Sequence, residues 1–473
     1  MPEVILPGTY ITVRDEGLIT AGRIASGYIG IVGTASRGPV DQVVTLGSFT
    51  EARNVFGDAD PWRGGADGEL TLIRALEQVF NNGGSTVYAV RAAGADAKGN
   101  SLSKRATYAV KAGGASPLTL SAATPGTWAN DISVVVTKGA TDKDPSTLEL
   151  VLGTAHEVFT GATAGDLGAA VNKSSRLATA AVNAAAAGAV PDAVDEDAKA
   201  VFKGGASGEA AGGADYARGL ALLENEIVNI VILAGQDTGM ADVLEAHLKR
   251  TEQIRRERIG VIGSNGKDDV DAIAGHAMDN GRLIFVAPGI RVKTPDPATR
   301  KDVEISLPGG YTAAAVAGLI ASLPVQTSPT NKTLAVSGVS TQLNTPRLEK
   351  LVQSRVLAVE KREGYRVVKG ITTATNPAWH QVTTRRIVDY AIYGVRSACN
   401  PYIGKLNNSR VRSAMKATID GFLTRMVQDE ALVGYQLEVG ATRAQEIAGE
   451  AIVTMTIQPT FSIDFIMVTM YLG

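Results

Sequence analysis

Two hydrophobic patterns alternate in the first part of the chain. The short apolar runs Tyr28–Thr34 and Thr86–Arg91 predict buried strands, because they have no polar face. Between them, Leu72, Leu76 and Phe80 recur every four residues, which predicts an amphipathic helix. The order strand, helix, strand indicates an α/β layer.

The same alternation returns in the middle of the chain. Ile227–Leu233, Ile259–Ile262 and Leu283–Val286 are apolar runs that predict further buried strands. Helices are expected at Met240–Arg250 and Tyr311–Leu323, and the small residues of the second helix allow close packing on a sheet. The α/β domain is therefore split in the sequence, and its two parts enclose a different segment.

The enclosed segment is rich in strand signals. Leu118–Leu120, Ile132–Thr137 and Leu148–Leu152 are short apolar runs separated by Gly, Pro and Asp. They lead into Thr160–Asp215, where half of the residues are Ala or Gly and where Leu167–Ala187 could form an Ala-rich helix. We expect a small inserted domain with an exposed, tolerant surface.

The last third of the chain changes in character. Residues 346–473 carry a net charge of +5, whereas residues 1–345 carry −7. Two long helices are expected at Thr383–Ala398 and Asn408–Met426. The expected strands are Arg355–Val359, Tyr365–Val368, Leu432–Val439 and Ile452–Ile457. This part predicts an α+β domain.

Together these patterns predict an α/β and α+β multidomain protein with an extended arm at each end. The expected regions are an N-terminal arm (1–22), a split α/β core (23–95 and 206–345), an inserted β-rich outer domain (96–205), an α+β C-terminal domain (346–458) and a C-terminal arm (459–473). An insertion of this kind is tolerated where the ends of the inserted domain lie close together.

Both arms are strand-like and lie outside any domain that the pattern defines. The C-terminal arm has a single charge, Asp464, and no proline within Phe461–Tyr471. One interpretation is that the arms pair inside their own domain; the other is that they add strands to the sheets of neighbouring subunits. The candidate linking residues are Val4, Ile5, Tyr10, Ile11 and Val13 at the N-terminus and Phe461, Ile463, Phe465 and Met467 at the C-terminus.

Composition excludes several classes of protein. The 473 residues carry a net charge of −2, which argues against a dedicated nucleic-acid binder. The single cysteine, Cys399, and four dispersed histidines provide no disulfide framework and no metal-binding cluster. The longest apolar stretch is about half of the ~20 residues that a membrane span requires, and the N-terminus shows no signal peptide. We expect no metal, no cofactor and no membrane insertion.

Two short segments, far apart in the sequence, suggest hydrolase chemistry. Asp237-Thr238-Gly239 follows a buried strand, and Gly310-Tyr311-Thr312 leads into a small-residue helix, as the acid and the nucleophile do in subtilases. A triad also requires a base that the acid orients, but His247 and His276 lack the His-Gly-Thr context. We therefore expect no catalytic residue, while a serine/threonine hydrolase that uses Asp237 and Thr312 remains the alternative.

Four basic residues lie close together in the C-terminal domain. Arg412 and Lys416 are four apart and share one face of a predicted helix, and Lys405 and Arg410 come just before them. These side chains either form a solvated helix face or dock onto an acidic protein surface.

Several segments together resemble the contractile tail sheath proteins of myovirus-type phages. Pro7-Gly8-Thr9-Tyr10 resembles the family's PGVY arm, and Gly30–Val40 resembles its GIVGTA-RGP block. Val79–Arg91 is similar to the F-NGG-x-x-YVVR pattern, Pro125–Asn130 to the entry into the outer domain, and Trp379–Arg386 to the W-x-x-x-x-x-RR element. The order and spacing of these motifs span nearly the whole chain.

The resemblance implies a non-enzymatic subunit that stacks in hexameric rings around a tail tube. It implies a subtilisin-like core without the triad, an outer domain that protrudes, and arms that add strands to adjacent C-terminal domains. Its partners would be further copies of the chain, the tube protein, and the baseplate and tail terminator proteins. Contraction would drive the tube through the host envelope, and the protein would be assembled in the host cytoplasm into the virion tail.

The resemblance gives the basic residues Lys405, Arg410, Arg412 and Lys416 a possible role facing the tube. The sheath of a tailocin or of a bacterial contractile injection system would have nearly the same sequence signals, so this origin is the second interpretation.

Overall fold

The computed structural model describes residues 25–65, 68–139, 144–195, 200–208, 210–267, 269–295 and 301–472. The chain divides into two compact units. Of the described residues, the sheet unit comprises those in Gly27–Leu323 and Pro329–Thr375, and the C-terminal unit comprises Ala25, Ser26, Pro324–Ser328 and residues 376–472. The backbone therefore passes four times from one unit to the other.

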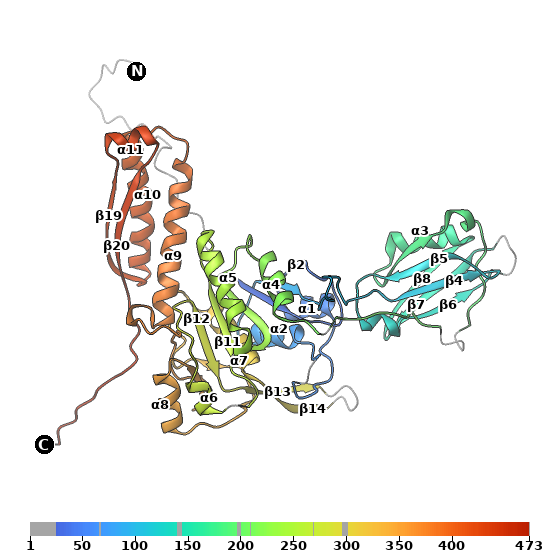
Figure 1. Ribbon diagram of the computed structural model, residues 1–473, viewed down its shortest axis with the longest axis horizontal. Coiled ribbons are helices and arrows are strands. Elements are labelled where there is room, and N and C mark those ends of the chain that lie inside the picture. Colours follow the sequence, from blue (N-terminus) through green and yellow to red (C-terminus); the bar gives the residue numbers. More distant parts are fainter. Residues whose placement is uncertain are drawn as a thin grey trace, which may run out of the picture. The chain divides into compact units, whose positions relative to one another are not determined.

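A nine-stranded sheet forms the centre of the sheet unit (Figure 1), in the order β15-β18-β17-β12-β11-β10-β1-β3-β2. Six central strands run parallel to one another, and the pairings at the edges, β2 with β3, β18 with β17 and β15 with β18, are antiparallel. The parallel strands are β1 (Ile29–Gly33), β3 (Val87–Arg91), β10 (Ile230–Asp237), β11 (Ile259–Gly263), β12 (Leu283–Ala287) and β17 (Leu357–Lys361); the others are β2 (Val43–Leu46), β15 (Thr333–Leu334) and β18 (Tyr365–Val367). The apolar runs of the sequence are these parallel strands, because such strands are buried on both faces.

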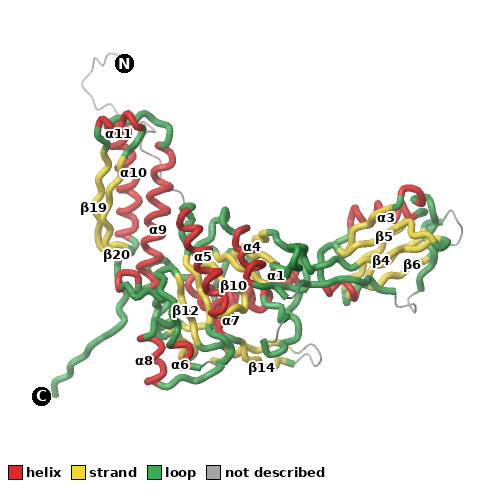
Figure 2. Tube along the Cα trace, in the orientation of Figure 1, coloured by secondary structure: helices red, strands yellow, loops and turns green. Residues whose placement is uncertain are grey.

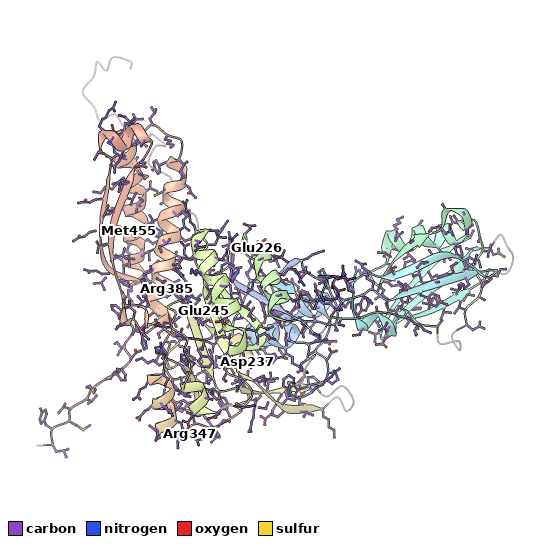
Figure 3. All side chains as sticks on the ribbon, in the orientation of Figure 1. Glu226, Asp237, Glu245, Arg347, Arg385 and Met455 are labelled. Atoms are coloured by element: carbon purple, nitrogen blue, oxygen red, sulfur yellow. The ribbon has the colours of Figure 1, made fainter. Side chains whose placement is uncertain are left out.

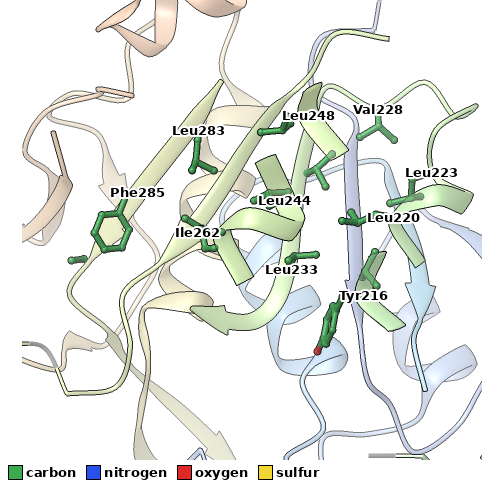
Figure 4. Packing of buried hydrophobic residues seen from close by; sticks show 14 of the residues in the cluster. Tyr216, Leu220, Leu223, Val228, Leu233, Leu244, Leu248, Ile262, Leu283 and Phe285 are labelled. Atoms are coloured by element: carbon green, nitrogen blue, oxygen red, sulfur yellow. The ribbon is translucent and has the colours of Figure 1, made fainter. Parts of the chain in front are cut away.

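Helices pack on both faces of this sheet. Helices α4 (Gly213–Leu222), α5 (Ala241–Gln253), α6 (Val270–Ala274) and α8 (Thr345–Gln353) share one hydrophobic cluster with the strands, part of which is drawn in Figure 4. Helix α7 (Gly309–Ser322) packs on β10, β11 and β12 and against α2 (Leu72–Asn81), which also contacts α1 (Phe49–Phe56). Gly318 permits the α2–α7 contact, because a Cβ atom there would lie 2.3 Å from the carbonyl oxygen of Val79.

A separate small sheet lies beside the carboxyl end of β12. It consists of β13 (Ile290–Pro295), β14 (Asp302–Leu307) and β16 (Gly338–Val339), with β13 in the centre. Its connection to the main sheet runs through Pro288 and Gly289, which directly follow β12.

The inserted segment folds around its own hydrophobic core. One three-stranded sheet is β4 (Thr107–Ala112), β5 (Ala115–Ala122) and β9 (Ala178–Val182); the other is β6 (Ser133–Thr137), β7 (Ser146–Leu152) and β8 (Ala155–Gly161). The inserted segment is therefore rich in β-strands. The Ala-rich stretch Leu167–Ala187, however, is not one helix: α3 (Ala164–Ser174) ends at Ser175 and is followed by β9.

Arg91 joins the core to the insertion and to the connection that follows it. Its guanidinium is fully buried and donates to the carbonyl oxygens of Gly38 and Pro125 at 2.7 Å and of Ser207 at 3.1 Å. Pro125 lies inside the insertion, between β5 and β6, and Ser207 lies 82 positions later, in the connection that returns to the sheet. One side chain of β3 thus fixes three chain segments.

The C-terminal unit consists of two helices and one hairpin (Figure 2). Helices α9 (Val382–Cys399) and α10 (Ser409–Gln428) pack on each other and on β19 (Leu432–Gly440) and β20 (Ile452–Pro459), which the short helix α11 (Arg443–Ala448) connects. Gly394 allows the ring of Phe422 to lie directly on α9, where a Cβ atom would be 1.9 Å from the ring.

The boundary between the two units differs from the predicted position at residue 346. The expected strands near Arg355–Val359 and Tyr365–Val368 are present as β17 and β18, but they belong to the nine-stranded sheet. The longest segment of the C-terminal unit begins at Asn376. The reason is that Leu357 and Ala358 pair with β12 as a parallel neighbour, which the change in local charge did not reveal.

Candidate assembly surface

The hairpin of the C-terminal unit has one apolar face. Tyr435, Leu437, Val439, Val453 and Ile457 pack against the core that α9 and α10 form. The opposite face carries polar side chains, including Gln436 paired with Thr456 and Glu438 paired with Thr454. Figure 3 labels Met455, which pairs with Leu437 on the apolar row. The strands therefore alternate as expected for a sheet with one solvated side.

Both edges of this hairpin are open. Within the described chain, β19 pairs only with β20, and these two strands form a sheet of their own. Each strand therefore presents one row of N–H and C=O groups that no neighbouring described strand satisfies. Such an edge is a template for a strand of another chain.

The described part of the C-terminal arm is exposed from Phe465 to Leu472. The chain from Thr460 to Leu472 has no regular secondary structure, so the expected strand over Phe461–Tyr471 is not formed within the described chain. Phe465 is 74% and Met467 92% exposed, and the residues between and after them are similarly exposed. The apolar residues of the arm are not confined to alternate positions, and those exposed are Phe461, Ile463, Phe465, Ile466, Met467, Val468, Met470, Tyr471 and Leu472.

The N-terminal linking candidates Val4, Ile5, Tyr10, Ile11 and Val13 lie outside the described residues.

The four basic residues do not have the same environment. Lys405, Arg410 and Lys416 are exposed. Arg412, by contrast, is only 14% exposed and forms an ion pair with Glu446 of α11 at 3.0 Å, with a hydrogen bond to Asn407 at 2.8 Å. Hydrogen bonds from Arg443 and Arg412 lower the pKa of Glu446. Arg412 therefore holds α11 to α10.

An apolar patch that the sequence did not indicate lies beside these cations. Ile403 and Leu406, in the connection from α9 to α10, are 79% and 78% exposed, and Ile447 of α11 is 77% exposed. Asn407 donates to the carbonyl oxygen of Glu450 at 2.8 Å and so joins this connection to α11. In the sequence, residues 403–406 (Ile-Gly-Lys-Leu) have neither helical nor strand periodicity. Such a segment indicates a turn, and its two large apolar residues are the only sign of an exposed patch.

The hydrolase candidates do not form a triad. The hydroxyl of Thr312 is fully buried and donates to the carbonyl oxygen of Pro288 at 2.8 Å. Asp237 accepts from the N–H of Gly239 at 2.8 Å and so caps a short turn. His276 is hydrogen-bonded to the carbonyl oxygen of Ser354 at 2.6 Å. Each group is occupied in a local structural role.

A cavity of about 650 Å³ lies at the carboxyl ends of β1 and β10, near Asp237. Trp62, Tyr216 and Tyr311 contribute aromatic walls, and Glu69 and Asp237 contribute carboxylates. No histidine, cysteine or lysine is present among its described lining residues. The described lining therefore lacks the histidine that a Ser-His-Asp triad uses as its base. In the described part of the chain, no group of three His, Cys, Asp or Glu side chains could hold a metal ion.

His247 is buried away from this cavity, and it makes stability depend on pH. Its Nε2 lies 3.3 Å from Nη1 of Arg258, and burial followed by the charge of Arg258 lowers its pKa from 6.5 to about 3. Below pH 6.5 the unfolded chain therefore binds a proton that the folded chain does not, so stability falls as the pH falls towards 3.

We expect His247 to reduce the free energy of unfolding by about 2 kcal/mol between pH 7 and pH 5. Urea unfolding of the wild type and of His247→Gln at both pH values measures this difference. The variant should lose less stability on acidification than the wild type. Equal losses in the two proteins would contradict a neutral, buried His247.

The comparisons with known proteins define the class as phage tail sheath proteins. Residues 209–373 match the family described as phage tail sheath protein central domain, and residues 374–473 match phage tail sheath C-terminal domain. The chain belongs to the phage tail sheath family and is a structural subunit of a contractile sheath. The junction of the two matches, at residue 373, lies next to the observed start of the C-terminal unit at Asn376.

Solved sheath structures share the fold. The sheath tail protein of Desulfitobacterium hafniense is 16% identical with a TM-score of 0.68, over 96% of this chain and 100% of that chain. The sheath tail protein of Listeria innocua is 14% identical with a TM-score of 0.68, over 94% and 95%. The contracted helical sheath of the anti-feeding prophage is 15% identical with a TM-score of 0.57, over 99% of both chains. No curated protein sequence matches the chain. In the described residues, no helix is long and apolar enough to cross a bilayer.

Proposed function

We propose that this sheath protein polymerises as stacked hexameric rings around a tail tube and contracts to drive the tube through the host envelope. The proposal rests on two features that one unit combines. The hairpin β19–β20 has open edges, and the C-terminal arm exposes apolar side chains. An arm donated to a neighbour's hairpin would satisfy the open edge and cover the apolar side chains. This arrangement favours strand addition between subunits over pairing within one domain.

The sheet unit would form the outer body of the particle. We propose that it is a subtilisin-like layer without a triad, with Asp237 and Thr312 at the positions of the acid and the nucleophile but in structural roles. The inserted domain, which has its own hydrophobic core, would protrude from it. The hydrolase alternative is not favoured, because Thr312 is buried and hydrogen-bonded to the backbone.

The partners would be other copies of the chain, the tube, the baseplate and the tail terminator. Among the solved structures with this fold are an anti-feeding prophage baseplate and the sheath complex of an extracellular contractile injection system, whose chains are 15% and 13% identical to this one. A phage tail in a virion and a tailocin or injection system are both compatible with this fold. In either case we propose that assembly takes place in the cytoplasm of the producing cell.

Imaging of the purified protein by negative-stain electron microscopy tests the proposal directly. Tubes or stacked rings with sixfold symmetry are the expected result. Dispersed globular particles at all concentrations, with and without a tube, would overturn it.

We propose that the exposed cations Lys405, Arg410 and Lys416 face the tube. Reversing all three to Glu should reduce tube-dependent assembly in the extended state by at least tenfold, because each lost attraction becomes a repulsion. Co-sedimentation with tubes measures this effect, and it should weaken with rising salt in the wild type. The exposed cation Arg443 of α11 provides a single-site control, and unchanged co-sedimentation of the triple variant would reject the assignment.

A further inference from the structure

The C-terminal arm does not leave its own unit freely, because one glutamine side chain holds its first residues. Gln381 precedes α9 as its N-cap residue, but its side chain does not cap the helix. Instead, Oε1 accepts from the N–H of Ser462 at 3.2 Å and Nε2 lies 3.4 Å from the carbonyl oxygen of Ser462. The amide of Gln381 thus pairs with both backbone groups of one residue, as an adjacent strand would.

Two further contacts strengthen this attachment. The hydroxyl of Ser462 donates to Oε1 of Gln381 at 3.2 Å, and Nε2 of Gln381 donates to a carboxylate oxygen of Asp464 at 3.3 Å. Asp464 is the single charged residue of the arm. Ser462 and Asp464 are half-buried, whereas every described residue after Asp464 is exposed. The character of the arm therefore changes at Asp464.

The same end of α9 also holds the start of the C-terminal unit. Arg386 is buried and donates to the carbonyl oxygens of Ser26 at 3.2 Å and Pro324 at 3.1 Å. The guanidinium of Arg385, one position earlier, lies over the ring of Trp379 at 3.6 Å. This packing fixes the helix end that carries Gln381, so the attachment point of the arm is rigid.

We propose that Gln381 is the positioning residue that fixes the origin of the exchanged arm, so that residues 461–464 stay with their own subunit and the part after Asp464 is donated to a second copy of the chain. The inference rests on the proposed strand exchange between subunits. The donated part would be short and almost entirely apolar, and its register on the neighbour's hairpin would be set by the fixed starting point.

Spin labels on the unassembled protein test the anchor. In a Cys399→Ser background, a nitroxide at Ile463→Cys should be restrained, and Gln381→Leu should make it clearly more mobile. A label at Thr469→Cys should be mobile in both proteins. The control Gln428→Leu, which changes an exposed glutamine at the end of α10, should alter neither label. Unchanged mobility at position 463 in Gln381→Leu would overturn the proposal.

Assembly provides the second measurement. Gln381→Leu should raise the critical concentration for tube formation about tenfold, because loss of the anchor leaves more arm to be ordered on docking. Ser462→Pro removes the N–H donor without changing α9 and should have the same effect. It replaces Gln381→Leu in this test if that variant does not fold. If the wild type forms no tubes, the proposed function fails while the label test of the anchor still stands. If both variants assemble like the wild type, the anchor is rejected.

Discussion

Removal of residues 465–473 should leave a folded protein that no longer polymerises. The described residues of this segment, 465–472, are exposed and form no strand pairing with the described chain, so the C-terminal unit should keep its thermal transition. Docking of the arm would bury up to seven large apolar side chains, each worth about 1.5–3 kcal/mol when fully buried. Even after the cost of ordering the arm, its loss should raise the critical concentration more than 100-fold.

Sedimentation velocity and electron microscopy over a concentration series measure this effect. The longer deletion of residues 461–473 should be no more severe, because the residues up to Asp464 stay with their own subunit. The matched control keeps the arm but replaces Phe465, Met467 and Thr469 by Ser, which preserves its length and removes apolar contact on one side. Tubes of normal appearance from both deletions would contradict strand exchange through this arm.

Arg91→Met should be the most destabilising single substitution in the sheet unit. It removes a charged donor from the carbonyl oxygens of Gly38, Pro125 and Ser207 and leaves them buried. Hydrogen bonds from charged groups contribute about 1.5–3 kcal/mol each, so we expect a loss of about 3–5 kcal/mol after partial compensation. The attachment of the insertion should loosen in particular, because the oxygen of Pro125 belongs to the insertion and that of Ser207 to the connection that follows it.

Thermal unfolding together with limited proteolysis checks this prediction. Cleavage near Pro125 and Ser207 should become faster before the core unfolds. Arg105→Met is the control, because exposed Arg105 donates to one carbonyl oxygen, that of Ala122, at 2.9 Å. If Arg91→Met and Arg105→Met were equally stable, the Arg91 contacts would not be what holds the insertion to the core.

Local hydrophobic patterns correctly predict those helices and strands that need only an apolar neighbour to pack against. The four-residue spacing of Leu72 and Leu76 predicts α2, and the apolar runs predict the parallel strands, because burial on both faces demands such sequences. The Ala-rich stretch shows the limit. Asn172 both donates to the carbonyl oxygen and accepts from the N–H of Ala180 at 2.8 Å, which ties α3 to β9. That contact depends on the tertiary structure and has no periodicity.

The roles of the candidate site residues could not be predicted, because their contact partners lie far away in the sequence. Arg412 and Lys416 share a helix spacing, but only Arg412 meets Glu446, which is 34 residues further along the chain. Asp237 and Thr312 have the local sequence of a hydrolase, and only the fold shows that Thr312 is bonded to Pro288. The role of Gln381 was similarly hidden, because its partner Ser462 lies 81 positions away.

The four backbone passages between the two units have a mechanical consequence. A unit attached by one linker can swing and twist about it, and tension on that linker is carried by a single chain. Here the passages at residues 26–27, 323–324, 328–329 and 375–376 distribute tension over four strands of backbone. If subunits exchange arms as proposed, tension that enters a C-terminal unit would therefore reach the sheet unit through four backbone crossings and not through one.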